Sequence, residues 1–418
     1  GLPSLDRNGN TVYDMGAKEF GSCMKALVEA GASVIGGCCG TTPEHIRAGC
    51  EETKDLNLPL RKKPEQRFLT SERQTIAFGL DDNFIIVGER INPTGKKKLQ
   101  EQLRTGSMDM VADFAEEQEA CGAGILDINM GMGGIDEKSM MLKALDTVGS
   151  VTSLPLSLDS SHVDVLEAAL RRYPGRALVN SVSYEKIKFD SLLPVVKKYG
   201  AMFVLLPLSD QGLPESLEEK IDIIEKIKAR ACELGMSKED IVVDGLVTTV
   251  GANKNAALET LETIRYCKED LGLATICGLS NISFGLPERV FVNSAFLTMA
   301  IASGLTMAIA NPNQTLLANA ALASDLLLNK PEADLKYING VAKAQISADV
   351  PKQTQAQEET GVHPLFTVVV KGKEGQVLEL VKKELERGES PAAIIDSYLI
   401  PAINHVGELF EKGTYFLP

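Results

Sequence analysis

The sequence predicts an α/β protein whose main part is a (β/α)8 barrel, the TIM-barrel architecture. Three observations lead to this prediction: short apolar runs alternate with helical segments, there are eight such runs, and they fill the span from residue 84 to residue 311. Eight strand–helix units in about 250 residues match the size of such a barrel. A doubly wound open sheet would show the same alternation and is the alternative. The count of eight favours the barrel.

Each run is rich in β-branched or aliphatic residues and closes on polar residues, as a buried parallel strand should. In chain order the runs are FIIVGER (84–90), GILDIN (124–129), PLSLDS (155–160), ALVNSV (177–182), MFVLLPLS (202–209), IVVDGL (241–246), TICGLSN (275–281) and TMAIANP (306–312). A helical segment follows each run, so we expect the barrel domain to occupy residues 79–332.

Residues 1–60 predict one slice of a second α/β domain. The patterns indicate a helix over 17–32, a strand over 33–39 and a helix from Pro43 to Asp55. A single slice cannot bury both faces of its strand, so we expect the last piece of another α/β domain, which the resemblance given below implies is the C-terminal remnant of a partial barrel. The stretch 61–78 is rich in proline and charge and is predicted to be a linker.

Residues 333–418 predict an incomplete helical bundle. An amphipathic helix is expected over 374–388, and a second over 390–413, with Ser390 as its N-cap and a kink at Pro401. The chain has no initiator methionine and stops directly after a helical pattern. We therefore expect a piece of a longer protein.

Composition narrows the class of function. The chain carries 57 acidic and 43 basic side chains, a net charge of −14, which argues against a nucleic-acid partner. Its apolar runs fall short of the roughly 18 to 20 residues that a membrane helix needs. The eight cysteines are scattered without a disulfide-scaffold spacing, which indicates a reducing compartment, and a cytoplasmic location is expected.

Polar residues close most of the predicted strands, at the end of a barrel where active sites lie. They are Glu89, Arg90, Asn92, Asp127, Asn129, Asp159, Asn180, Asp244 and Asn281. Such carboxylates and amides suit a flat heterocycle with an amidine-like edge and a carbonyl, as in a pterin. Mg²⁺ binding is the rival use. Capping of the next helix explains any one of these residues, but it is a weaker explanation for five of eight strands.

The stretch GGCCGTTPEHI (36–46) places Cys38 and Cys39 side by side at the end of a predicted strand. A disulfide between adjacent cysteines would be strained, whereas two thiolates at a strand end suit Zn²⁺. His45 is a poor further ligand, because it follows Pro43 at the start of a helix and is expected to face solvent.

Several of these stretches carry a resemblance. ERINPTGKKKL (89–99), LDINMG (126–131), SLDSS (157–161), VNSVS (179–183), DGLVTTVG (244–251) and GLSNISFGLPER (278–289) resemble the pterin-binding barrel of methyltetrahydrofolate methyltransferases. GGCCGTTPEHI resembles the end of a homocysteine-binding zinc barrel, and PAINHVGELFEKGTYFLP (401–418) resembles a cobalamin cap. The three occur in the order of the cobalamin-dependent methionine synthase family.

The resemblance implies roles for particular residues. The folate contacts it implies are Gly95, Lys96, Lys97, Asp127, Asn129, Asp159, Asn180, Asp244, Asn281 and Arg289. The residues it implies in the cobalamin cap are Asp396, Phe410 and Leu417, although helical spacing alone would make the last two bundle core. Cys38 and Cys39 would be zinc ligands, with the third ligand upstream of residue 1. We expect this zinc site to be empty or weakly metallated.

The implied reaction moves the methyl group of 5-methyltetrahydrofolate to cob(I)alamin and then to homocysteine, giving methionine and tetrahydrofolate. The leaving ring nitrogen must be protonated or strongly hydrogen-bonded, and we expect Asn281 and Asp244 to serve this step. The cobalamin-binding domain would be a partner beyond residue 418. The alternatives are a stand-alone methyltetrahydrofolate:corrinoid protein methyltransferase and a folate-binding fragment without independent activity.

Overall fold

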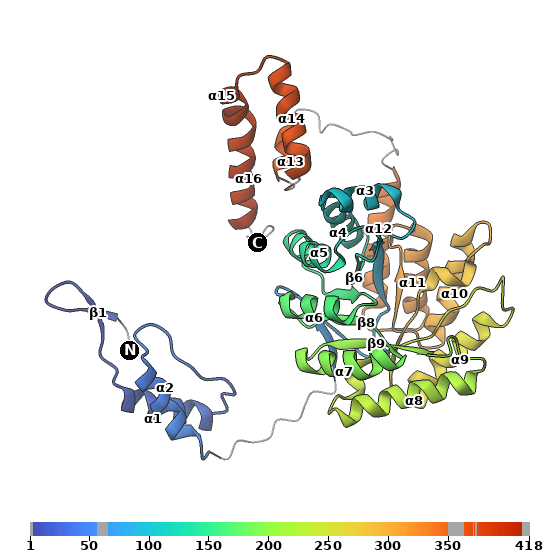
Figure 1. Cartoon of the computed structure of the whole chain (residues 1–418), viewed down its shortest axis with the longest axis horizontal. Coiled ribbons are helices and arrows are strands. Elements are labelled where there is room, and N and C mark those ends of the chain that lie inside the picture. Colours follow the sequence, from blue (N-terminus) through green and yellow to red (C-terminus); the bar gives the residue numbers. More distant parts are fainter. Residues whose placement is uncertain (1–2, 57–65, 350–362, 371, 373, 412–418) are drawn as a thin grey trace. The chain divides into compact units, whose positions relative to one another are not determined.

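The computed structural model describes residues 3–56, 66–349, 363–370, 372 and 374–411 (Figure 1). The chain divides into two compact units, Gly1–Glu65 and Gln66–Pro418. Each unit is described by itself.

The second unit contains the predicted eight-stranded barrel. Its strands are β5 (Ile85–Ile91), β6 (Ile125–Asn129), β7 (Leu156–Asp159), β8 (Leu178–Tyr184), β9 (Met202–Ser209), β10 (Ile241–Asp244), β11 (Ala274–Ile276) and β12 (Met307–Ala310). They pair in parallel in the order β11-β10-β9-β8-β7-β6-β5-β12. The two outer strands also meet, because Ile309 donates its N–H to the carbonyl of Cys277 at 2.9 Å. The prediction of eight strands and of a closed barrel is confirmed.

Helices surround the strands, as Figure 1 shows. They are α3 (Lys97–Thr105), α4 (Asp109–Ala120), α5 (Glu137–Val151), α6 (Val163–Arg172), α7 (Lys186–Tyr199), α8 (Leu217–Glu233), η1 (Lys238–Asp240), α9 (Ala256–Glu269), η2 (Leu279–Ser283), α10 (Arg289–Ala302) and α11 (Thr315–Leu327). Buried helix residues such as Leu166 and Ile224 share one apolar core with strand residues such as Leu158 and Phe203. This core holds the strand ends in fixed positions.

A β-hairpin covers the N-terminal end of the barrel. Strands β3 (Arg67–Thr70) and β4 (Thr75–Phe78) pair antiparallel. Leu69 and Phe78 are fully buried against the first residues of several barrel strands, including Leu178 and Met202. Both strands lie in the stretch 61–78, which was predicted to be a linker because it is rich in proline and charge. Residues 67–78 form this hairpin instead. With this end covered, the C-terminal end is left for ligands.

The first unit contains two packed helices, α1 (Ala17–Glu29) and α2 (Pro43–Thr53), and a short antiparallel pair, β1 (Pro3–Leu5) and β2 (Thr11–Tyr13). Both helices confirm predictions. The predicted strand over 33–39 is wrong, because these residues are irregular in the structure. A strand needs a hydrogen-bonding neighbour, and the two described strands of this unit pair with each other.

The C-terminal part is helical, as predicted. It comprises α12 (Ala333–Asp349), α13 (Pro364–Val370), α14 (Glu374–Glu386), α15 (Pro391–Ile394), the π-helical turn η3 (Ile395–Leu399) and α16 (Ile400–Glu411). Ser390 is the expected N-cap, since its Oγ accepts the N–H of Ala393 at 3.2 Å. The π-helical turn directly precedes α16, in which Pro401 lacks an N–H donor. Of the helices in the described ranges, none is long and apolar enough to cross a membrane.

Candidate functional site

Polar residues from neighbouring strands meet at the C-terminal end of the barrel. Strand register places Asn129 of β6 beside Asp159 of β7, and Asp159 beside Asn180 of β8. Two residues earlier in each strand, Asp127 of β6 lies beside Ser157 of β7. Sequence-predicted residues from three strands therefore form one continuous set, because parallel strands in register bring equivalent positions together.

Asp127 lies at the centre of this set. Its Oδ1 accepts hydrogen bonds from the Ser157 hydroxyl at 2.6 Å and from the Asn180 amide at 3.2 Å. Burial, and secondly the nearby charge of Asp159, raise the pKa of Asp127 to about 8. The carboxyl group is therefore mostly protonated at pH 7 and can donate a hydrogen bond as well as accept one.

The side chain of Asp159 is held by Asn129. The Asn129 amide donates to Asp159 Oδ2 at 2.9 Å, and the Asn129 carbonyl oxygen accepts the N–H of Gly131 at 2.8 Å. Burial raises the pKa of Asp159, while the hydrogen bond from Asn129 and the charge of Lys188 oppose that rise. The Asn129 side chain thus fixes the carboxylate in place.

Asp244 closes β10, on another part of the same barrel end. Its Oδ1 accepts the N–H of Leu246 at 2.8 Å. Burial raises the pKa of Asp244 to about 6, and the hydrogen bond from Leu246 and, secondly, the charge of Lys220 limit the rise. Asp244 is therefore mostly ionised at pH 7, in contrast with Asp127.

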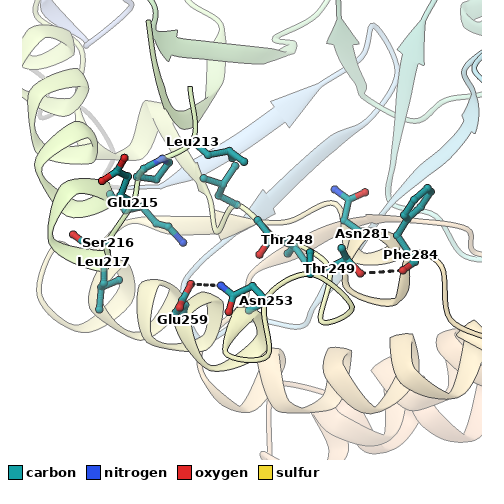
Figure 2. A pocket seen from close by; sticks show the side chains of 16 residues that line it. Leu213, Glu215, Ser216, Leu217, Thr248, Thr249, Asn253, Glu259, Asn281 and Phe284 are labelled. Atoms are coloured by element: carbon teal, nitrogen blue, oxygen red, sulfur yellow. Dashed lines mark hydrogen bonds between the residues drawn. The ribbon is translucent and has the colours of Figure 1, made fainter. Parts of the chain in front are cut away.

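A cavity of about 600 Å³ opens beside Asn281 (Figure 2). It lies between the loops that follow β9, β10 and β11, and its walls are formed by residues 213–217, Lys220, residues 246–249, Ala252, Asn253, Ala256, Glu259, Asn281 and Phe284. Two bonds brace the walls: Thr249 Oγ1 donates to the Phe284 carbonyl at 3.0 Å, and the Asn253 amide donates to Glu259 Oε2 at 3.1 Å. Asn281, in η2, is the predicted site residue that lines this space.

The first barrel loop brings cations to the same end. Gly95 adopts a positive φ of 73°, which glycine tolerates without strain. Lys96 donates to the carbonyl of Asn92 at 3.1 Å. Burial raises the pKa of Glu89, and the charges of Lys96 and Arg289 oppose the rise. Lys97 begins α3 and is exposed.

Arg289 is fixed by the loop that holds Asn281. Its Nε donates to Ser283 Oγ at 3.0 Å, and its Nη2 donates to the Ser280 carbonyl at 2.5 Å. The guanidinium therefore braces η2, and its charge also acts on Glu89.

Two of the polar residues at the first strand end serve the fold. The Arg90 guanidinium pairs with Glu117 and lies over the Phe114 ring, 4.2 Å from its centroid. The Asn92 side chain accepts the N–H of Thr94 at 2.9 Å. Arg90 thus turns to α4 on the outside of the barrel, and Asn92 shapes the loop.

Lys220 and Glu259 line the cavity but were missed in the sequence. Lys220 is only 6% exposed, and it shares the buried face of α8 with Ile223, Ile224 and Ile227. Buried lysines are rare. A lysine in phase with an apolar helical stripe was the signal that could have singled it out.

The paired cysteines of the first unit supply two thiols. Cys38 Sγ and Cys39 Sγ lie 3.6 Å apart. His45 is already engaged, since its Nδ1 accepts the N–H of Thr42 at 3.2 Å and its Nε2 lies 2.9 Å from the Met15 carbonyl. The expectation that His45 faces solvent is therefore wrong. Among the described residues no group of three or more His, Cys, Asp or Glu side chains could hold a metal, so two thiols do not complete a zinc site.

The cobalamin-cap residues fall at the C-terminal end of the described chain. Asp396 is exposed in the π-helical turn η3. Phe410 belongs to α16, and its side chain is outside the description. Leu417 lies outside the described residues.

The fold and site define a (β/α)8 barrel with carboxyl and amide groups gathered at its C-terminal end. Comparison with known families agrees with this class. The family described as pterin binding enzyme matches residues 88–311, more than half of the chain, and the chain belongs to that family. Residues 1–53 match homocysteine S-methyltransferase, and residues 362–418 match the B12 binding domain.

Two curated relatives match the whole chain. They are the methionine synthases of Mycobacterium tuberculosis, 30% identical over 444 residues, and of Mycobacterium leprae, 30% identical over 448 residues. The chain spans 37% of the length of each relative. A solved structure, 7,8-dihydropteroate synthase from Vibrio fischeri, is 16% identical with a TM-score of 0.49, over 63% of this chain and 98% of its own.

Proposed function

We propose that this chain transfers the methyl group of 5-methyltetrahydrofolate to cob(I)alamin. The observation that carries the proposal is the linked set of Asp127, Asn129, Asp159 and Asn180, with Asp244 at the same barrel end. The match of residues 362–418 to a B12 binding domain supports a corrinoid as the acceptor.

The charge states of the aspartates suit a pterin ring. Asp244, ionised at pH 7, can accept ring N–H groups, and Asp159 can accept others where Asn129 orients it. Asn180 can serve the carbonyl edge of the ring, since its side chain carries both donors and an acceptor. Gly95, Lys96, Lys97 and Arg289 are assigned to the ring oxygen or the anionic glutamate tail.

Departure of the ring nitrogen needs help from the protein. A secondary amine anion is a very poor leaving group, so the nitrogen must gain a proton or a strong hydrogen bond as the C–N bond breaks. Asn281 is the polar residue we assign to this role, because it borders a cavity large enough for water and lies in a loop fixed by Arg289. Bound cob(I)alamin would supply the nucleophile that takes the methyl group.

The second part of the proposal is that the methyl group then passes to homocysteine. It rests on the match of residues 1–53 to homocysteine S-methyltransferase. Cys38 and Cys39 are the residues assigned to zinc, but the described residues supply no third ligand beside them, and no step is routed through the metal. The cytoplasmic location remains a proposal, supported by eight free thiols.

A stand-alone methyltransferase that serves a separate corrinoid protein is the second candidate. The matches at residues 1–53 and 362–418 favour the first candidate, the methyl transfer proposed above, because a stand-alone methyltransferase needs neither region. A folate-binding module without catalysis is the third candidate, and activity measurements separate it from the other two.

Asn281→Ala tests the catalytic assignment. We expect methyl transfer to exogenous cob(I)alamin to slow by about 100-fold, the usual loss when one transition-state hydrogen-bonding group is removed, while folate affinity changes little. Asn255→Ala is the matched control, since Asn255 is an exposed asparagine at the start of α9 and makes no side-chain cap bond. Equal rates for wild type and Asn281→Ala, with normal folate binding, would show the assignment to be wrong.

A further inference from the structure

Lys220 is a buried cation that the site described so far does not use. It projects from α8, is 6% exposed, and its Nζ lies 3.4 Å from the carbonyl of Gly245, the residue directly after Asp244. It also lines the cavity that Asn281 borders. A lysine has three N–H donors, and burying its charge is costly unless anions surround it.

Two carboxylates supply that compensation. The charges of Glu259, from α9, and of Asp244, from β10, raise the pKa of Lys220 against the effect of burial. Glu259 is itself held by the Asn253 amide at 3.1 Å. Lys220 therefore interacts electrostatically with a carboxylate at the pterin end of the barrel and with a second one in the cavity wall.

The remaining titratable groups that face this cluster are thiols. Cys277 faces Asp244, and Cys267 faces Lys220. Burial raises the pKa of Cys267 to about 12 and that of Cys277 well above its ordinary value. Both thiols stay neutral around pH 7, so the groups that favour the ionised form of Asp244 here are the backbone N–H of Leu246 and the charge of Lys220.

We propose that Lys220, buried against the backbone directly after Asp244, is a positioning residue for Asp244, whose carboxylate accepts hydrogen bonds from the N–H groups of the bound pterin. This inference rests on the proposed function of the site. In this role Lys220 acts through Asp244, while its side chain also lines the cavity beside Asn281.

The consequence is a shift in the pH dependence of binding. Burial already raises the pKa of Asp244 to about 6 with Lys220 present, so pterin affinity should fall as the pH drops below about 6. Removing an opposite charge beside a carboxylate typically raises its pKa by about 1 unit or more. Without Lys220, Asp244 becomes protonated near neutral pH and loses acceptor capacity there.

The test is the pH profile of 5-methyltetrahydrofolate binding to the full chain, measured by equilibrium titration between pH 5 and pH 9. Lys220→Met should move the acid-side midpoint upward by about 1 pH unit or more, weaken binding about two-fold or more at pH 7 and leave it near wild type at pH 9. Lys220→Arg, which keeps the charge, should restore the wild-type midpoint. Titration of the pterin itself is common to all variants and cancels in the comparison.

Lys330→Met is the matched control. Lys330 is also a buried lysine, with an 11% exposed side chain that pairs with Asp325 at 2.8 Å, and neither residue lines the cavity. Its loss should lower stability without moving the midpoint of binding. If Lys220→Met keeps the wild-type midpoint, or if Lys330→Met shifts it equally, the inference is wrong. Absence of binding by the wild type at every pH would instead overturn the proposed function.

Discussion

Two aspartates at the same barrel end differ in protonation state at pH 7: Asp127 is mostly neutral and Asp244 is mostly ionised. The pKa of Asp127 is raised to about 8, because the side chain is buried and Asp159 lies close. The pKa of Asp244 is raised only to about 6, because the hydrogen bond from the Leu246 N–H and, secondly, the charge of Lys220 offset part of the burial. At pH 7 one carboxyl group can donate a hydrogen bond and the other accepts. A ligand with both acceptors and N–H donors along its edge, such as a pterin, matches this arrangement.

Asp127→Asn tests the protonation of Asp127 through stability. The native carboxyl binds a proton up to about pH 8, whereas in the unfolded chain it has released it above about pH 4. Its contribution to the free energy of unfolding is therefore present at low pH and is lost by about 1.4 kcal/mol per pH unit between these values. The asparagine variant has no group that titrates at this position, so its stability does not fall with pH in this way.

Chemical denaturation at several pH values measures this effect. Relative to wild type, Asp127→Asn should gain stability steadily from pH 4 to pH 8. Parallel curves for the two proteins would mean that Asp127 is ionised in the native state.

At the scale of elements, the hairpin β3–β4 acts as a lid on the N-terminal end of the barrel. It is tied to the loops before β7 and β8: Ser71 Oγ donates to the Ser153 carbonyl at 2.7 Å, and the Arg176 N–H donates to Thr70 Oγ1 at 2.7 Å. Leu69 and Phe78 fill the space between the first strand residues. The hairpin therefore belongs to the barrel core.

Phe78→Ala should lower the free energy of unfolding by about 3 to 5 kcal/mol, because it leaves a cavity where the ring is 2% exposed. Thr75→Ala is the control in the same strand. Thr75 is exposed, and its replacement should stay within about 0.5 kcal/mol of wild type. Urea denaturation followed by circular dichroism measures both changes, and a similar small effect for both would show that the hairpin is a loosely attached linker.

The elements that the sequence predicts correctly differ from those that it misses in how clear their local pattern is. The eight barrel strands are recognisable because each is a buried apolar run closed by polar residues, with a helix after it. The hairpin was missed, since Phe68, Leu69, Ile76 and Phe78 are separated by a charged turn in a proline-rich stretch. The strand expected over 33–39 failed for the opposite reason: its residues suit a strand, but pairing depends on neighbours that local pattern cannot supply.

The same distinction applies to the site. Asp127, Asn129, Asp159 and Asn180 follow from position, because strand ends in register must meet. Lys220 and Glu259 lie on helices, and only the fold brings them to the cavity. Charge states also depend on burial, so the contrast between Asp127 and Asp244 could not be predicted from two aspartates that each end a strand.

For the whole molecule, the barrel is the part whose strands and site are described in full. Matches to homocysteine S-methyltransferase and to a B12 binding domain flank it, and the chain spans 37% of its curated relatives. The proposed division of labour assigns the folate half-reaction to the barrel and its cavity. That half-reaction can be examined with free cob(I)alamin as the acceptor and without homocysteine.

The most direct test is therefore methyl transfer by the full wild-type chain from 5-methyltetrahydrofolate to exogenous cob(I)alamin, followed by the change in corrin absorbance, with folate affinity titrated in parallel. We expect saturable folate binding and a methyl-transfer rate that follows the bound fraction and exceeds the protein-free rate. Folate binding without any acceleration of methyl transfer would contradict the account and leave a binding module.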